Sequence, residues 1–177
     1  MIQEIYQSAM KFAGEKHKSQ KVPGTEANYL LHISNVAMEV MVAHQAKGDF
    51  DLELSIQVAI LHDTLEDTET TYEELAQKFS ERVAEGVLAL TKNAELPSKK
   101  ERMADSLKRV ALLEKEVGLV KLADRITNLQ KPPAHWSIEK INGYHQEAKL
   151  INQVLSNKNE YLNNRLAAKI EEYEQYL

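Results

Sequence analysis

The chain has 177 residues, of which 43% are hydrophobic and 28% charged, so we expect one globular domain over residues 1–177. Its net charge of −5 argues against binding to duplex nucleic acid, and the absence of cysteine means that any metal must be held by His, Asp or Glu. Because no apolar run is long enough to cross a bilayer and no signal peptide is recognisable, we expect no membrane partner and a cytoplasmic location.

The predicted elements are all helices. Apolar residues recur with the 3.6-residue period of an amphipathic helix, strand-like alternation is hard to find, and the chain has only 6 Gly and 4 Pro. Thr71 with Glu74, and Ser98 with Glu101, have the spacing of capping boxes that open helices. We predict an all-α bundle of about eight or nine helices, with periodic segments at residues 2–13, 36–44, 52–60, 71–79, 83–90, 103–111, 119–129, 138–155 and 161–170.

The end of the third predicted helix carries an unusual concentration of ionisable groups. His62, Asp63, Glu66 and Asp67 follow directly on an apolar stretch. If the helix continues, His62 lies one turn from Glu66, and Asp63 lies one turn from Asp67. Buried charges need a counter-charge, and a divalent cation such as Mn²⁺, Fe²⁺ or Zn²⁺ binds imidazole and carboxylate together.

Two further candidates for this metal site lie elsewhere in the chain. His32 follows an apolar approach, and Asp124 stands inside a segment apolar enough to be buried, with Asn128 one turn beyond it. We expect the neighbouring Lys121 and Arg125 to point away from Asp124. The candidate ligands then form a two-histidine, two-carboxylate set that leaves coordination positions open for water and substrate: His32, His62, Asp63 and Asp124.

The order His … His-Asp … Asp resembles the signature of the HD superfamily. The blocks His62-Asp63-Thr64-Leu65-Glu66-Asp67-Thr68 and Lys121-Leu122-Ala123-Asp124-Arg125, the latter followed by Asn128-Leu129, are similar to the hydrolase domain of the RelA/SpoT family. Stand-alone small alarmone hydrolases are the most similar in size. The resemblance extends from about Ala9 to about Leu155.

This resemblance implies a fold, an activity and a set of roles. It implies a single helical HD domain that uses one manganese ion to remove the 3′-pyrophosphate from guanosine tetra- or pentaphosphate, giving GDP or GTP and pyrophosphate. The four candidate ligands would hold the metal, and Glu66 and Asp67 would orient the attacking water and handle its proton. Lys21, Asn128 and Tyr144 would contact this small phosphorylated nucleotide.

The segment around Lys21 departs from the family pattern and leaves the substrate open. Asn28-Tyr29 precedes His32 where the family tends to have Pro-Tyr, Ile33 follows it where a proline is usual, and Val22 replaces a common basic residue. An HD phosphohydrolase acting on an adenosine alarmone or NADPH is therefore an alternative. A non-catalytic nucleotide sensor is another, although such a sensor has no need for Glu66 and Asp67.

Overall fold

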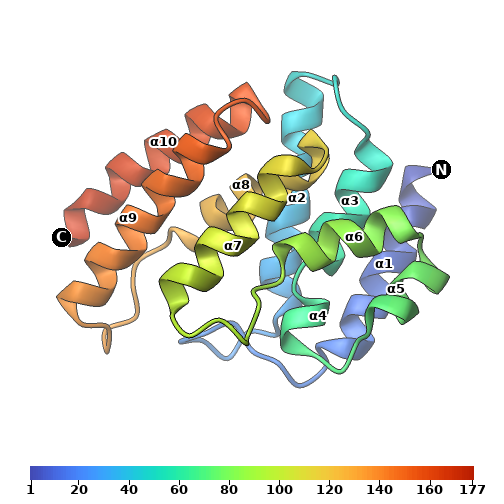
Figure 1. Cartoon of the computed structure of the whole chain (residues 1–177), viewed down its shortest axis with the longest axis horizontal. Coiled ribbons are helices and arrows are strands. Elements are labelled where there is room, and N and C mark those ends of the chain that lie inside the picture. The colour runs from blue at the N-terminus through green and yellow to red at the C-terminus, as the bar shows by residue number, and fades with distance from the viewer.

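The computed structural model describes all residues from 1 to 177 and confirms the all-α class (Figure 1). The chain forms ten α-helices and one short 3₁₀ helix, and its only β-type pairing is an isolated bridge between Lys21 and Asn28. The elements are α1 (Ile2–Lys16), α2 (Leu30–Ala46), α3 (Leu52–Leu61), α4 (Thr64–Asp67), α5 (Tyr72–Lys78), α6 (Glu81–Leu90), α7 (Lys99–Leu112), α8 (Lys115–Asn128), α9 (Ile138–Val154), α10 (Glu160–Tyr173) and η1 (Glu174–Tyr176).

Both predicted capping residues open helices. At α7 the box is complete, because the Ser98 hydroxyl accepts from the Glu101 backbone N–H while the Glu101 carboxylate accepts from the Ser98 N–H. At α5 the Thr71 hydroxyl accepts from the backbone N–H of Glu74. The Glu74 carboxylate does not return this contact, because it accepts from Lys16 Nζ at 2.8 Å and so ties α5 to α1.

The helix through His62 does not continue as the sequence pattern predicted. α3 ends at Leu61, and the four-residue α4 begins only at Thr64. The Thr64 hydroxyl donates to the Leu61 carbonyl at 2.7 Å, satisfying an acceptor at the end of α3 that a continuous helix would have used. This break places His62 and Asp63 in a sharp corner, and α4 is the helix that the periodicity did not reveal.

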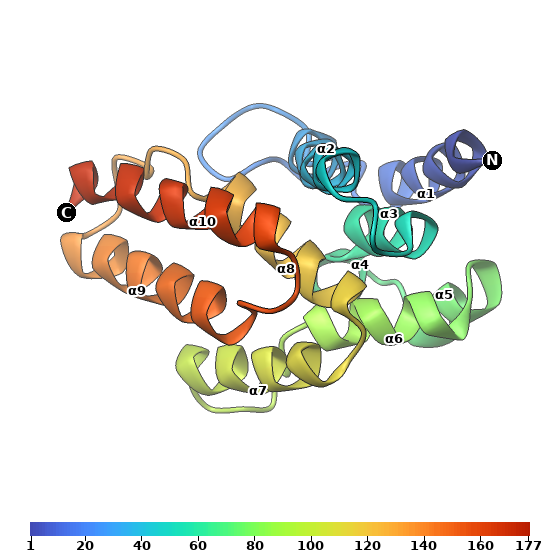
Figure 2. The same ribbon diagram turned by 90° about the horizontal axis from the view of Figure 1, so that it is seen from above.

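Helix α8 is the centre of the fold. Every residue from Glu116 to Ile126 is buried, and α2, α3, α6, α7, α9 and α10 all pack against it. Figure 2 shows the α9–α10 hairpin on one side of α8, while α1, α3, α5 and α6 lie toward the other. Charged side chains on α8 therefore lie in the interior, where each of them needs a partner.

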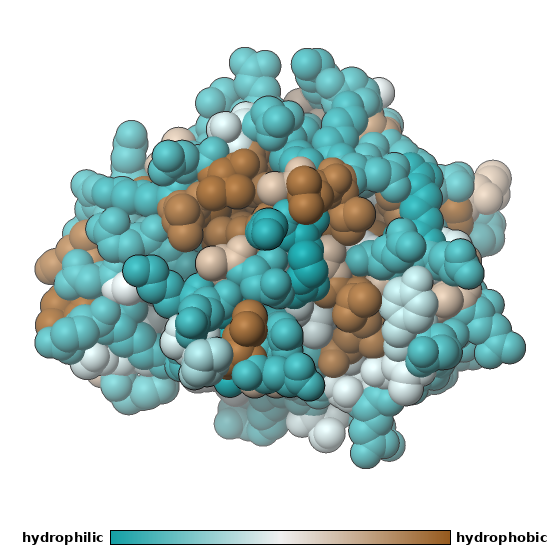
Figure 3. Space-filling view, viewed as in Figure 1, coloured by the Kyte–Doolittle hydropathy of each residue, from teal (hydrophilic) through white to brown (hydrophobic).

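The outer surface is mostly hydrophilic. On the face shown in Figure 3, polar side chains surround separate apolar patches that lie across the middle. Scattered apolar side chains are common on globular proteins and carry no functional argument alone. None of the helices combines the length and the apolar character that crossing a bilayer requires.

Candidate active site

Four donor atoms from three separate segments converge beside α8. The two imidazole Nε2 atoms of His32 and His62 lie 3.2 Å apart. Asp63 Oδ2 lies 2.9 Å from His62 Nε2 and 3.8 Å from His32 Nε2. Asp124 Oδ1 approaches the same two nitrogens at 3.5 Å from His32 and 3.9 Å from His62. The three segments are the first turn of α2, the corner after α3 and the last turn of α8.

The chemistry of this donor set fits a divalent cation. Ligands about 2.1 Å from a metal lie roughly 3.0–3.4 Å from one another, which matches the spacing between the two imidazole nitrogens. His62 Nδ1 lies 2.8 Å from the Ala59 carbonyl oxygen, so Nδ1 carries the proton and Nε2 is free to coordinate. His32, His62 and Asp124 each offer an atom within 4.8 Å of the others, and Asp63 joins them through its contact with His62.

The electrostatics of the cluster also favour a cation. Burial alone would lower the pKa of His62, but the carboxylates of Asp63 and Asp124 outweigh burial and raise this pKa to about 9. Burial would raise the pKa of Asp63, but His62 acts in the opposite direction and holds it below its ordinary value. The Tyr29 hydroxyl donates to Asp63 Oδ2, and burial together with this carboxylate raises the pKa of Tyr29.

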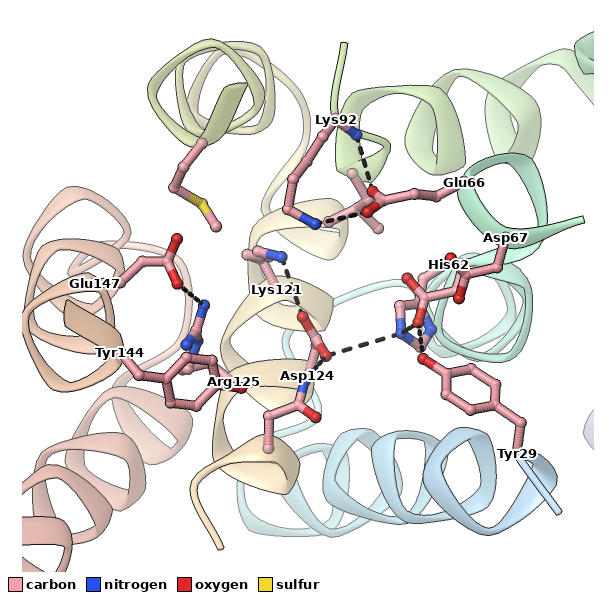
Figure 4. A pocket seen from close by; sticks show the side chains of 14 residues that line it. Tyr29, His62, Glu66, Asp67, Lys92, Lys121, Asp124, Arg125, Tyr144 and Glu147 are labelled. Atoms are coloured by element: carbon pink, nitrogen blue, oxygen red, sulfur yellow. Dashed lines mark hydrogen bonds and ion pairs between the residues drawn. The ribbon is translucent and has the colours of Figure 1, made fainter. Parts of the chain in front are cut away.

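Asp124 has more partners than the sequence indicated. Lys121 Nζ donates to Asp124 Oδ2 at 3.1 Å, so the prediction that Lys121 points away is wrong. Residues three apart share a helix face, and the buried ammonium has no better acceptor there. Asn128 Nδ2 donates to Oδ1, the oxygen that faces the histidines. Lys121, whose contact with Asp124 is drawn in Figure 4, and Asn128 thus fix the Asp124 carboxylate in its orientation toward the cluster.

A pocket opens next to these donors and contains both predicted catalytic carboxylates. Glu66 accepts from Lys92, through Nζ at 2.7 Å and through the backbone N–H at 3.0 Å. Asp67 accepts from Gln20 Nε2 at 2.8 Å. Burial, with Asp63 and Glu66 nearby, raises the pKa of Asp67. The backbone N–H of Asp67 donates to the Asp63 carbonyl at 2.9 Å, so Asp67 still lies one helical turn beyond Asp63 although α3 ends at Leu61.

The far end of the pocket is formed by α8 and α9. Arg125 donates to Glu147 Oε2 at 2.8 Å, and its guanidinium lies 4.2 Å from the centre of the Tyr144 ring. Two of its nitrogens, Nε and Nη1, are buried without a partner. Arg125 therefore points away from Asp124 as predicted, and Tyr144 and Asn128 line the pocket as the substrate role requires.

The predicted substrate contact Lys21 lies elsewhere. Its side chain is 56% exposed, its ammonium pairs with Glu26 in the α1–α2 loop, and it does not line the pocket. The pocket takes its cations from Lys92, Lys121 and Arg125 instead. Lys92 carried no signal in the sequence, because it follows α6 and reaches Glu66 only through the tertiary fold.

Residues 9–161 match the family described as HD domain. The chain belongs to the HD-domain family. The guanosine-3′,5′-bis(diphosphate) 3′-pyrophosphohydrolase MESH1 of Danio rerio is 34% identical over 162 residues, covering 89% of this chain and 87% of that protein. A guanosine-3′,5′-bis(diphosphate) 3′-pyrophosphohydrolase of Aquifex aeolicus is 42% identical over 130 residues, covering 72% of this chain but only 18% of that larger protein.

Two solved structures share the fold of this chain. A metazoan ortholog of SpoT that hydrolyzes ppGpp superposes with a TM-score of 0.81 over 95% of this chain and 94% of its own, at 25% identity. A protein of Listeria monocytogenes superposes with a TM-score of 0.66 over 84% of this chain and 99% of its own, and at 23% identity it supports the fold alone. The chain is thus an HD-domain hydrolase related to the ppGpp pyrophosphohydrolases.

Proposed function

We propose that this HD-domain hydrolase removes the 3′-pyrophosphate from guanosine 3′,5′-bis(diphosphate)-type alarmones, giving GDP or GTP and pyrophosphate. The observation that carries the proposal is the convergence of His32, His62, Asp63 and Asp124 at the edge of a pocket that also holds Glu66 and Asp67. The names of the similar Danio rerio and Aquifex aeolicus proteins support the choice of substrate.

The metal we propose is one manganese ion, with iron or zinc as chemically acceptable replacements. His32 and His62 would supply imidazole nitrogens, while Asp63 and Asp124 would supply carboxylate oxygens. When bound, a divalent cation provides Lewis acidity at the attacked phosphorus and lowers the pKa of a water molecule. The rest of the chemistry falls to residues of the chain.

Proton transfer is the task that we assign to Glu66 and Asp67. In the reaction, the oxygen of water bonds to the phosphorus next to the ribose 3′-oxygen, and the bond between that phosphorus and the 3′-oxygen breaks. The water loses a proton, and the 3′-oxygen gains one. The raised pKa of Asp67 suits a group that holds and releases a proton, and the position of Glu66 beside it suits orientation of the water.

The substrate carries several negative charges, and the pocket offers cations to receive them. Lys92, Lys121 and Arg125 line the cavity. Arg125 Nε and Nη1 make no hydrogen bond, so this guanidinium keeps donors that its pairing with Glu147 does not use. Asn128 and Tyr144 would contact the ribose or phosphate groups from α8 and α9.

One observation favours a second candidate substrate. Lys21, the residue expected beside the nucleotide, pairs with Glu26 outside the pocket. An adenosine alarmone or NADPH is therefore the alternative, cleaved by the same metal and carboxylates. A non-catalytic sensor would need neither Glu66 nor Asp67.

The experiment is identification of products by anion-exchange chromatography after incubation with manganese. Guanosine tetraphosphate, its adenosine counterpart and NADPH are compared at equal concentration. We expect GDP and pyrophosphate from the first substrate, and loss of roughly 10²- to 10⁴-fold in rate for E66Q and D67N. Faster cleavage of the adenosine compound or NADPH would assign the alternative substrate, and binding without cleavage of any of the three would indicate a sensor.

A further inference from the structure

The base of the α1–α2 loop is tied to the active site at Gln20 and Tyr29. The backbone N–H of Gln20 donates to the His17 carbonyl at 2.9 Å, closing the turn after α1. The backbone carbonyl of Gln20 accepts from the Tyr29 N–H at 3.0 Å, so the two ends of the loop are joined. Tyr29 reaches Asp63 with its hydroxyl, and Gln20 reaches Asp67 with its amide.

The Gln20 amide has a determined orientation. Its Nε2 lies 2.8 Å from Asp67 Oδ2, and an ionised carboxylate can only accept, so the NH₂ group must face Asp67. The carbonyl oxygen Oε1 then faces His17 Nδ1 at 2.6 Å. Because this oxygen can only accept, the proton of the His17 ring must sit on Nδ1. The direction of donation therefore runs from His17 to Gln20 to Asp67.

The buried His17 ring makes one hydrogen bond, the one to Gln20. Its side chain is only 1% exposed, its ring lies 5.2 Å from the Tyr29 ring, and Nε2 has no hydrogen-bond partner. A buried polar ring with one orphaned nitrogen is costly compared with an apolar side chain of similar size. The contact with Gln20 is the one polar interaction that this ring makes.

Asp67 depends on this contact. The Gln20 amide is its only side-chain hydrogen-bond partner, and Asp67 lies at the exposed end of the four-residue α4. Glu66, by contrast, is held at both oxygens by Lys92. Without Gln20, the Asp67 carboxylate is free to rotate about its side-chain torsions.

We propose that His17 and Gln20 are positioning residues that align the Asp67 carboxylate for proton transfer. The proposal rests on the proposed function, because it takes Asp67 to be catalytic. It assigns the base of the α1–α2 loop a task that does not involve Lys21: His17 orients the amide of Gln20, and Gln20 orients the carboxylate.

Two sets of variants separate alignment from general damage. Q20M removes the donor at nearly equal volume, and Q20E places a carboxylate against Asp67. Q7E is the matched control, because Gln7 is exposed on the same helix-and-loop segment and has no side-chain partner. At position 17, Asn carries its NH₂ close to the position of Nδ1, whereas Gln carries it close to that of Nε2. H17N therefore keeps the donor to Gln20, and H17Q loses it.

Kinetics of pyrophosphate release give the first readout. We expect kcat to fall about 10- to 100-fold in Q20M and H17Q, and further in Q20E, with KM little changed. H17N and Q7E should keep most of the wild-type kcat. Thermal unfolding of each variant checks that the fold is intact. Equal kcat in wild type, Q20M and H17Q would overturn the proposal, and so would equal losses in H17N and H17Q.

Long-range ¹H–¹⁵N NMR of the histidine rings gives a second readout that needs no substrate. We expect the His17 ring of the wild type to be protonated on Nδ1, and this preference to be lost in Q20M. Protonation on Nε2 in the wild type would overturn the proposed donation from His17 to Gln20. The wild type could cleave no alarmone and still show protonation on Nδ1 that is lost in Q20M. That pair of results would reject the proposed function but keep the hydrogen bonds that connect His17 to Asp67 through Gln20.

Discussion

Each cationic side chain that lines the pocket is paired with a carboxylate. Lys92 binds Glu66, Lys121 binds Asp124, and Arg125 binds Glu147. Burial would lower the pKa of Lys92, but Glu66 and the other nearby carboxylates raise it, so the ammonium stays charged. At the scale of single residues, two of these pairs hold the proposed catalytic carboxylate of Glu66 and the proposed ligand Asp124 in place before a substrate arrives.

Loss of the Lys92 side chain should release Glu66. We expect K92M to lower kcat/KM for pyrophosphate release by roughly 10²-fold, because Glu66 keeps only the contact with the backbone N–H. K92R, which preserves a charged donor, should retain more activity. K100M is the control, since Lys100 is exposed and unpaired at the start of α7. Similar kcat/KM values in K92M and K100M would rule out this role.

Protonation of His62 should make the stability of the metal-free protein depend on pH. The pKa of His62 is about 9 in the folded protein and 6.5 as the ordinary value, so the folded state holds the proton more tightly. The resulting stabilisation is fully present below pH 6.5 and is lost as pH rises through 9. In chelator, Tm should therefore fall from pH 6.5 to 9.

Manganese should remove this fall in Tm, because the ion replaces the proton at the cluster. The control is H62Q in chelator, which lacks the titrating imidazole and should show a weaker dependence on pH. A wild-type Tm in chelator that stays level or rises over this range would contradict the assigned state of His62.

At the scale of elements, the packing of α8 against its neighbours positions the site. α8 contributes the buried Asp124 and Lys121 and the more exposed Asn128 from one face, and the buried Arg125 from another. α6 reaches α3 and α8 through Gly86, where an added Cβ would lie 3.0 Å from Val58 Cγ2 and 3.2 Å from Val117 Cγ2. The absence of a side chain at Gly86 lets these three helices approach closely.

Substitution of Gly86 tests this packing. We expect G86A to lower the free energy of unfolding by about 1–3 kcal/mol, because the methyl group overfills the contact between helices. G143A is the matched control: a Cβ at Gly143 in α9 meets nothing within 4 Å. G143A should stabilise the protein by about 0.5–1 kcal/mol through helix propensity. Chemical denaturation measures both, and equal effects of the two variants would disprove the packing argument.

The sequence predicts the elements better than the contacts between them. Apolar periodicity locates every helix except α4, because four residues are too few to show a period and the Thr64 hydroxyl ends α3 early. The motifs predict that one metal site contains four residues, and in the fold these four side chains lie in one cluster: His32, His62, Asp63 and Asp124. Gln20 and Lys92 were not predicted, because they reach their partners across 47 and 26 residues of chain, and no local pattern encodes that distance.

At the scale of the whole molecule, the pocket is lined by residues far apart in the sequence, from Tyr29 before α2 to Glu147 in α9. The α9–α10 hairpin is held to α2 by Arg165, which donates to both oxygens of the buried Glu39 at 2.6 Å. The pocket lining contains five carboxylates and three Lys or Arg side chains, so with His62 neutral, as coordination of a metal requires, two negative charges are in excess. A divalent cation would balance them.

This balance predicts that the metal is needed for binding as well as for catalysis. We expect the wild type to bind a non-hydrolysable analogue of guanosine tetraphosphate in manganese at least about tenfold more tightly than in chelator, because like charges repel an anion from the empty pocket. Isothermal titration calorimetry measures both affinities, and the same experiment with unphosphorylated guanosine is the control. Equal affinities for the tetraphosphate analogue with and without manganese would show that the metal does not govern binding.

The most direct test of the central claim is pyrophosphate release from guanosine tetraphosphate by the purified chain, stripped of metal and then titrated with manganese. We predict no release from the stripped protein, full activity at about one manganese ion per chain, and neither ion binding nor release in H32A or D124A. Undiminished release in chelator, or by either variant, would contradict the account.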